Sequence, residues 1–148
     1  MRTSLVLACA VAALVSCRST PQPSAALGPE RPWKEMTHDE RLDHMKRVVH
    51  PNMKPVFQSF DSAHFADFTC VTCHGSGAED ESFRMPNPGL PRLPGAPDGF
   101  ERLLAEKPDV VAFMANGVVP AMAAMLGEKP YDPQTHSGFG CFRCHTTK

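Results

Sequence analysis

Two short stretches decide how this sequence folds: "CVTCH" at residues 70–74 and "CFRCH" at residues 141–145. In each, two cysteines stand three positions apart, and a histidine directly follows the second cysteine. Only Thr146, Thr147 and Lys148 come after the second stretch, so any further residue that serves it must lie upstream. The chemistry of these two stretches therefore constrains the interpretation of the whole chain.

Three kinds of site use cysteine pairs at this spacing. The pairs can hold a zinc ion, they can form disulfides in an exported protein, or each can attach a haem. The histidines favour haem, because with 7 His among 148 residues a His would follow both pairs by chance about once in 450 cases. In haem attachment the two thiols form thioethers and the adjacent His binds the iron. We therefore expect two covalently attached haem c groups, haem 1 on Cys70, Cys73 and His74, and haem 2 on Cys141, Cys144 and His145.

The composition excludes some classes of partner. The chain of 148 residues is long enough for one small domain, and its formal net charge of −1 gives no basic signature for nucleic acid. One Trp, one Tyr and 15 prolines leave little bulk for a hydrophobic core, so bound cofactors would add apolar volume. The composition does not indicate an oligomeric state.

The N-terminus predicts export. Arg2 precedes the apolar stretch "LVLACAVAALV", which is too short for a comfortable membrane span and typical of a signal peptide. It runs into "LVSC", which resembles the lipobox of bacterial lipoproteins, so we expect residues 1–16 to be removed and Cys17 to carry lipid. Ordinary signal cleavage near the same place is the alternative. The protein would then lie on the periplasmic side of a bacterial membrane, inner or outer, with residues 17–36 as a flexible tether.

The remaining residues, 37–148, contain an internal repeat of about residues 37–75 and 107–145. At an offset of 69, the matched pairs are Met45 with Met114, Val49 with Val118, Pro51 with Pro120, and Met53 with Met122. At an offset of 71, Phe68 matches Phe139 and the two cysteine motifs align. We therefore expect two copies of one unit, a long helix followed by a turn and a short helix with the haem motif.

The expected fold is mostly α-helical. In the first copy, Thr37 and Glu40 form a capping-box pattern, and the apolar stripe that follows has helical spacing: Leu42, Met45, Val49, Met53, Val56 and Phe60. Pro51 and Pro55 are expected to kink or divide this helix. In the second copy, Pro108 suits a helix start and Gly127 a helix end, around the stripe Val111, Met114, Val118, Met122 and Met125. Asp61 and Asp132 are expected to cap the short helices that carry the cysteines.

A long proline-rich loop, 79–100, separates the two copies. Its prolines and glycines predict neither helix nor regular strand. Phe83, Met85, Leu90 and Leu93 supply apolar contacts, so we expect the loop to be ordered and to pack over a haem edge.

The second axial ligand of haem 2 must come from upstream in the chain, be water, or be absent, because only three residues follow its motif. Met53 and Met122 each stand two residues after the proline that the copies share, on the long helix that precedes a haem motif, and we expect them to be the distal ligands. The alternatives are Met85, His50, Met125, Met45 and Met114, with His64 and His136 as further histidines near the motifs. A methionine at helical spacing is otherwise a common core residue.

This arrangement resembles the multihaem cytochrome subunit of bacterial photosynthetic reaction centres, whose repeats place a helix with the axial Met before a helix ending in C-x-x-C-H. The resemblance covers roughly residues 37–75 and 107–145. The chain departs from that family in having two motifs and in the proline before each candidate Met. The resemblance implies His/Met ligation and does not imply a role in a reaction centre.

The expected function is that of an exported dihaem c-type cytochrome, an electron carrier that exchanges electrons with redox partner proteins. No nucleophile–base pair, phosphate loop or second metal cluster indicates an enzyme. The main alternative is haem-based gas binding or sensing, because cytochromes c′ also place one C-x-x-C-H motif near the C-terminus. Two weaker hypotheses are a small peroxidase with an open iron and a structural zinc protein.

Overall fold

The computed structural model describes residues 27–148, and these residues are mostly helical, as expected. The predicted signal peptide and Cys17 lie outside the described residues. The helical elements are η2 (Trp33–Glu35), α1 (His38–His44), η3 (Met45–Val49), α2 (His50–Phe60), α3 (Cys70–His74), η4 (Gly75–Ala78), α4 (Pro97–Glu106), α5 (Pro108–Phe113), η5 (Met114–Val118), α6 (Val119–Met125) and η6 (Cys141–Arg143). Pairing between extended segments in this range is limited to isolated bridges.

The first long helix consists of α1, η3 and α2, which follow one another without a break. Its start confirms the predicted capping box: the Glu40 N–H donates to Thr37 Oγ1 at 3.3 Å, and the Thr37 N–H donates to Glu40 Oε2 at 2.7 Å. Val49, Met53 and Phe57 are its buried apolar residues. Phe60, expected in the stripe, is 38% exposed, because the buried face continues through Phe57.

The second long helix consists of α5, η5 and α6. Pro108 occupies its first turn, as predicted, where a missing N–H leaves no intrahelical bond unmade. It ends before Gly127, whose φ of +65° suits glycine, and the Glu128 N–H donates to the Ala123 carbonyl at 2.8 Å. Both predicted ends of this helix are confirmed.

Both long helices contain a π-helical segment at matched positions of the repeat, η3 in the first and η5 in the second. The His50 N–H donates to the Met45 carbonyl, and the Val119 N–H donates to the Met114 carbonyl, each across five residues. Pro51 and Pro120 come next, and a proline ring needs space beside the carbonyl four residues earlier. The wide turn supplies that space, so the first helix is not divided at Pro51.

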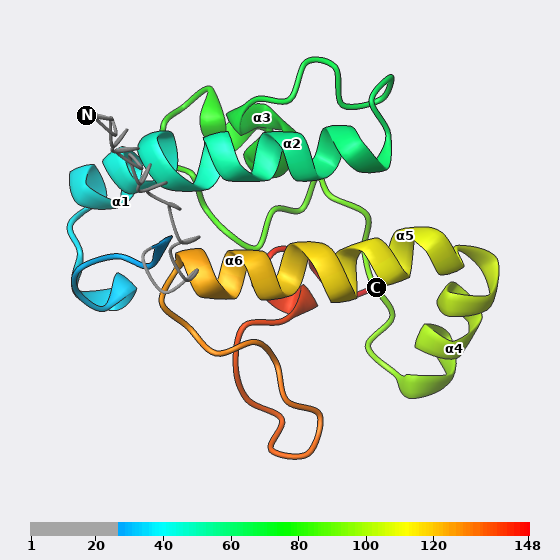
Figure 1. The fold of residues 1–148 in the computed structure, drawn as a ribbon. Helices are drawn as coiled ribbons and strands as arrows, with labels where there is room; N and C mark the ends of the chain where they lie inside the picture. The colour runs from blue at the N-terminus through cyan, green and yellow to red at the C-terminus, as the bar shows by residue number, and fades with distance from the viewer. Residues whose placement is uncertain (1–26) are drawn as a thin grey trace, which may run out of the picture.

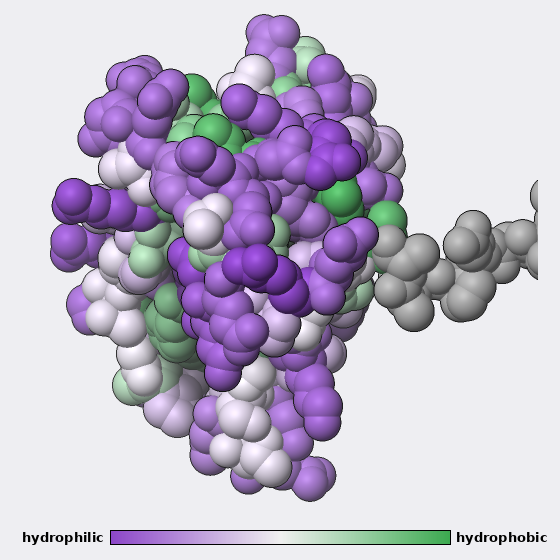
Figure 2. Space-filling model, turned by 90° about the vertical axis from the view of Figure 1, so that its left-hand side faces the viewer, coloured by the Kyte–Doolittle hydropathy of each residue, from purple (hydrophilic) through white to green (hydrophobic). Residues whose placement is uncertain are grey.

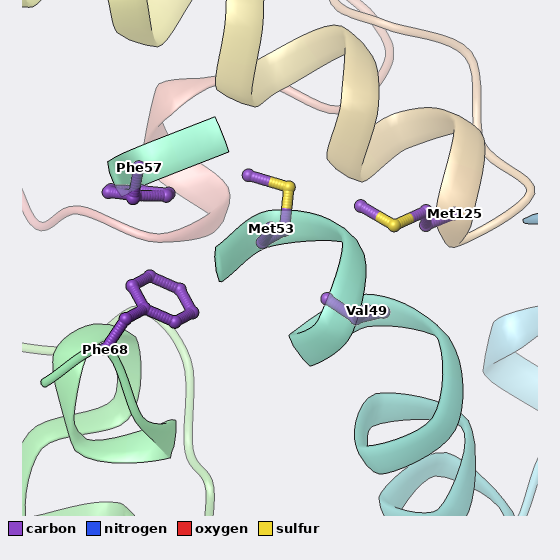
Figure 3. Close-up of a cluster of buried hydrophobic side chains, with 5 residues drawn as sticks. All are labelled: Val49, Met53, Phe57, Phe68 and Met125. Carbon is purple, nitrogen blue, oxygen red and sulfur yellow. The ribbon is translucent and has the colours of Figure 1, made fainter. Parts of the chain in front are cut away.

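The two long helices lie side by side with opposite chain directions (Figure 1). Their contacts are reciprocal, because α2 packs against η5 while α6 packs against η3. The core between them holds five buried residues, Val49, Met53, Phe57, Phe68 and Met125, as Figure 3 shows. The thioethers of Met53 and Met125 point into the space between α2 and α6. A second, smaller cluster contains Ala123, Leu126 and Phe139.

Part of the predicted tether packs against the helices. Trp33 lies edge-on to the buried His44 at 6.0 Å, and Arg41 Nε donates to the Trp33 carbonyl at 3.0 Å. Leu27 also contacts the main core cluster. The packed region therefore begins before residue 37, the position at which the sequence pattern predicts its start.

The proline-rich segment ends earlier than predicted. Residues 97–100 form the first turn of α4, because Pro97 and Asp98 suit a helix N-terminus. The rest of the segment is irregular, apart from an isolated bridge between Leu93 and Thr147. Hydrogen bonds from Asn87 anchor it to both cysteine motifs.

The expectation that Asp61 and Asp132 cap the cysteine-bearing helices is wrong. Asp61 Oδ1 accepts from the Ala63 and His64 N–H groups and so forms a turn that ends before α3 begins at Cys70. Asp132 Oδ1 accepts from the Gln134 N–H at 2.8 Å, in a turn of residues 133–136 that the backbone bond between Asp132 and Ser137 closes. Both side chains stabilise turns, which short polar residues do as readily as helix starts.

The surface around the long helices is mixed. The side drawn in Figure 2 is mainly hydrophilic, with small hydrophobic areas between the polar side chains. The second long helix, Pro108–Met125, is long and apolar enough to cross a membrane by length and composition alone, with a mean hydropathy of 1.3. In this structure its apolar residues Met114, Met122 and Met125 contribute to the shared core.

Candidate haem-binding site

The first motif forms a short α-helix of its own. The Thr69 N–H donates to Thr72 Oγ1 at 3.0 Å, and the Thr72 N–H donates to the Thr69 carbonyl at 3.1 Å. Thr72, inside the motif, thus satisfies a backbone donor at the helix start. Cys70 is exposed, whereas burial raises the pKa of the Cys73 thiol to about 12.

The second motif forms only a 3₁₀ turn, Cys141–Arg143, and it follows Gly138 and Gly140, which disfavour a regular helix start. Burial raises the pKa of the Cys144 thiol to about 11, with Arg143 opposing the shift. Arg143 donates to Glu128 at 2.7 Å, and its guanidinium lies 5.6 Å from the centre of the Phe139 ring. This motif is thus supported by groups outside it.

The two motif histidines have different surroundings. His145 Nδ1 donates to the Pro91 carbonyl at 2.9 Å. This bond places the proton on Nδ1 and leaves the Nε2 lone pair available to a metal. His74 Nδ1 is buried without a hydrogen-bond partner of good geometry, and burial lowers the pKa of His74 while the backbone of Phe83 opposes the shift. A neutral imidazole is the form that binds iron.

The two motifs are neighbours in space. Asn87 joins them: its Nδ2 donates to the Cys73 carbonyl at 2.9 Å, and its backbone N–H donates to the Cys144 carbonyl at 2.9 Å. Two groups attached to these motifs would therefore be held close together.

Asn87 did not emerge as a candidate from the sequence. It lies in "NPG", residues 87–89, a turn signal in which an Asn side chain commonly bonds the backbone two residues on. The Gly89 N–H does donate to Asn87 Oδ1, at 2.8 Å. The turn signal thus predicts this local bond, but it does not indicate contact with either cysteine motif.

The candidate methionines of the long helices gather in the core. Met53 and Met125 are 3% and 2% exposed, and Met45, Met114 and Met122 pack partly buried against the same cluster. Cys73 contacts this cluster, while Cys144 contacts the smaller one together with Met45 and Met122. Met85 is half-buried in the loop, outside both clusters. The structure thus places methionines and the second cysteine of each motif against the same clusters, without pairing one Met to one His.

The other histidines have separate contacts. His50 Nε2 donates to the Phe68 carbonyl at 3.3 Å, which leaves Nδ1 as the nitrogen with a free lone pair. His64 is exposed, and His136 is exposed beside the Tyr131 hydroxyl at 3.0 Å. His44, which the sequence did not single out, is buried and donates from Nε2 to the Met125 carbonyl at 2.7 Å, joining α1 to the end of α6.

The donor chemistry fits covalent haem. The four motif thiols are free, each pair is followed by a histidine, and thioethers lie nearby. Within residues 27–148, no three side chains among His, Cys, Asp and Glu converge in the way that a zinc site needs. A four-cysteine zinc site is therefore not assembled in this arrangement.

Comparison with known proteins adds no relative: no family model, no curated protein and no solved structure matches the chain.

Proposed function

We propose that the protein is an exported dihaem c-type cytochrome that carries electrons. The observation that carries the proposal is the presence of two C-x-x-C-H motifs that Asn87 joins by hydrogen bonds to the Cys73 and Cys144 carbonyls. Cys70, Cys73 and His74 would hold haem 1, and Cys141, Cys144 and His145 would hold haem 2. When bound, each haem supplies reversible one-electron exchange at its iron.

The residues of this chain provide the environment that such a carrier needs. The Pro91 carbonyl orients the His145 ring and increases the basicity of its Nε2. A soft Met thioether opposite each histidine, from Met53 and Met122 or from Met125, Met45, Met114 or Met85, would favour the reduced state. The apolar side chains around Cys73 and Cys144 exclude water from the side of the site that faces the core.

The proposed setting follows from the N-terminal pattern. A lipid on Cys17 would hold the protein on the periplasmic side of a bacterial membrane, where redox partner proteins donate and accept electrons. The mainly hydrophilic side in Figure 2 is compatible with a protein that works in water.

A second candidate function is gas binding or peroxidase chemistry at an open iron. Met53 and Met125 are tightly packed among Phe57, Phe68 and Val49, and if they keep this packing an iron would lack a strong second ligand. A five-coordinate iron binds small ligands that a six-coordinate iron excludes.

The test is the visible spectrum of the matured protein, oxidised and reduced, with and without CO, together with the mass of the chain. The electron-carrier proposal expects two covalent haems per chain, low-spin iron, no response to CO and the weak far-red band of Met-ligated ferric haem. Met53→Ala and Met122→Ala should each remove part of that band, whereas Met36→Ala, a control outside the candidate ligands, should not. A high-spin fraction that binds CO would favour the second candidate, and a chain without covalent haem would rule out both.

A further inference from the structure

The loop that contains Asn87 is fastened to the second motif by backbone groups and by His145. The Asn87 N–H donates to the Cys144 carbonyl, the Leu93 N–H to the Thr146 carbonyl and the Lys148 N–H to the Leu93 carbonyl, each at 2.9 Å. His145 Nδ1 donates to the Pro91 carbonyl at the same distance. Since three of these four bonds are between backbone groups, this attachment does not depend on which side chain stands at position 87.

The connection to the first motif depends on the Asn87 side chain. Nδ2 donates to the Cys73 carbonyl at 2.9 Å, and Oδ1 accepts from the Gly89 N–H at 2.8 Å, so the amide cannot turn over without losing both bonds. Asn87 is 7% exposed, and a Cβ at Gly75 would lie 3.1 Å from Nδ2. The amide is thus enclosed, and its hydrogen bonds are protected from exchange with water.

We propose that Asn87 is a positioning residue that fixes the separation and relative orientation of the two haem-attachment motifs. Its redox consequence rests on the proposed dihaem function. The backbone of the loop holds motif 2, the side chain of Asn87 holds motif 1, and the peptide at Cys73 leads directly to His74. Loss of the side-chain bond releases one motif from the other while each motif keeps its own thiols and histidine.

The test is the distance distribution between the two haems, measured by pulsed EPR on the full, matured protein with both irons ferric and low-spin. Asn87→Asp keeps an acceptor for Gly89 but loses the N–H that bonds the Cys73 carbonyl. Asn87→Ala loses both side-chain bonds. We expect one narrow distribution in the wild type and a broadened or shifted one in both variants, with two haems per chain retained.

Two controls separate positioning from a general loss of stability. Asn52→Ala removes an exposed Asn whose Nδ2 donates to the Val48 carbonyl at 2.7 Å, far from either motif in sequence, and should leave the distribution narrow. Phe57→Leu weakens the core and should lower Tm without broadening the distribution. A narrow, unshifted distribution in Asn87→Asp would overturn the proposal and leave the electron-carrier function standing.

The proposal also has a readout without haem. If the wild type carries no covalent haem, the proposed function fails, and nitroxide labels on Cys70 and Cys141, with the other cysteines replaced by serine, report the same separation. We then expect the label distance to broaden in Asn87→Asp, and an unchanged label distance would overturn the positioning role by itself.

Discussion

The two cysteine motifs have the same chemistry and different support. The first is an α-helix whose start is stabilised from within, through the bond between Thr69 and Thr72, and whose His74 Nδ1 has no hydrogen-bond partner of good geometry. The second is a 3₁₀ turn stabilised from outside, through Glu128, Phe139 and the Pro91 carbonyl. The motif therefore determines which atoms can bind a cofactor, whereas the residues around the motif determine how firmly those atoms are held in place.

The residue in the third position of each motif expresses this difference. Thr72 accepts a hydrogen bond from its own helix start, while Arg143 forms an ion pair with a residue fifteen positions away. The bond at Thr72 forms within one helix and does not depend on distant packing. The ion pair of Arg143 forms only when the rest of the fold brings Glu128 beside it. Substitutions at matched positions of the two motifs therefore test how far each motif depends on the rest of the fold.

The largest effect is expected at the matched phenylalanines that precede the motifs. Phe68 and Phe139 are each 4% exposed, and Phe→Ala in a core costs about 3–5 kcal/mol. The loss of unfolding free energy for Phe68→Ala should lie at the upper end of this range. The centre of the Phe68 ring lies 5.0 Å from that of Phe57 and 5.7 Å from that of His50, in the larger cluster. Urea unfolding of the matured protein, followed by far-ultraviolet circular dichroism, measures both.

The control for these variants is Phe142→Ala, since Phe142 is 43% exposed and should change the free energy of unfolding by less than about 0.5 kcal/mol. Equal losses for Phe68→Ala and Phe139→Ala would contradict the expectation that the larger cluster around Phe68 contributes more to stability than the smaller cluster around Phe139.

The next effect concerns the thiols before haem attachment. The pKa of Cys73 is about 12 and that of Cys144 about 11, so the thiolate fraction at a given pH is smaller for Cys73. After allowing for the greater nucleophilicity of the more basic thiolate, iodoacetamide should alkylate Cys144 about three- to fourfold faster than Cys73. Peptide mass mapping over time measures the two rates.

In urea the two alkylation rates should converge, because unfolding removes the burial that separates them. A ratio near one in the folded, haem-free chain would show that the second cysteines of the two motifs are equally accessible.

A smaller effect is expected from the helix start of the first motif. Thr72→Val keeps the shape of the side chain and removes the oxygen that accepts from the Thr69 N–H, which should cost about 1 kcal/mol of unfolding free energy. Thr147→Val, at an exposed Thr near the C-terminus, is the matched control. The same cost in both variants would mean that the bond within the motif contributes nothing specific.

The smallest effect is expected at Arg143. Its ion pair with Glu128 is half exposed, with side-chain exposures of 50% and 29%, so Arg143→Gln should cost about 0.2–1 kcal/mol. The cost should fall as salt is added, because exposed ion pairs are screened. Thermal unfolding at low and high salt tests this. A stability loss for Arg143→Gln that exceeds the loss for Thr72→Val would contradict the expectation that the exposed ion pair contributes less than the bond within the first motif.

Periodicity predicted the long helices well. The capping box at Thr37, the start at Pro108 and the stop at Gly127 are local patterns whose physical causes operate within a few residues, so the sequence was sufficient to find them. The repeat pairs Met45 with Met114 and Val49 with Val118, and these are the residues at which both π-helical segments begin and end. The π-helical geometry itself was not predicted, because a proline indicates strain and does not say how the helix relieves it.

Long-range contacts could not be predicted in the same way. Asn87, His44 and the Pro91 carbonyl owe their roles to partners that are 14 to 81 residues away in the chain, and only the folded arrangement brings them together. The sequence pattern at Asp61 and Asp132 predicts helix starts, but both residues lie in turns, because an Asp side chain bonds the backbone in the same way in a turn and in a helix cap. The helical spacing of the methionines does not identify the iron ligands, because a methionine that packs in the core and one that binds iron can have the same spacing.

The matched π-helical segments also bear on the origin of the fold. Such segments make up well under 1% of residues in globular proteins, so two at equivalent positions are most simply explained by one ancestral unit that already contained the feature. The reciprocal packing of α2 on η5 and of α6 on η3 is the contact pattern of a two-fold symmetric pair. The fold thus has the form of a homodimer whose two copies are joined in a single chain.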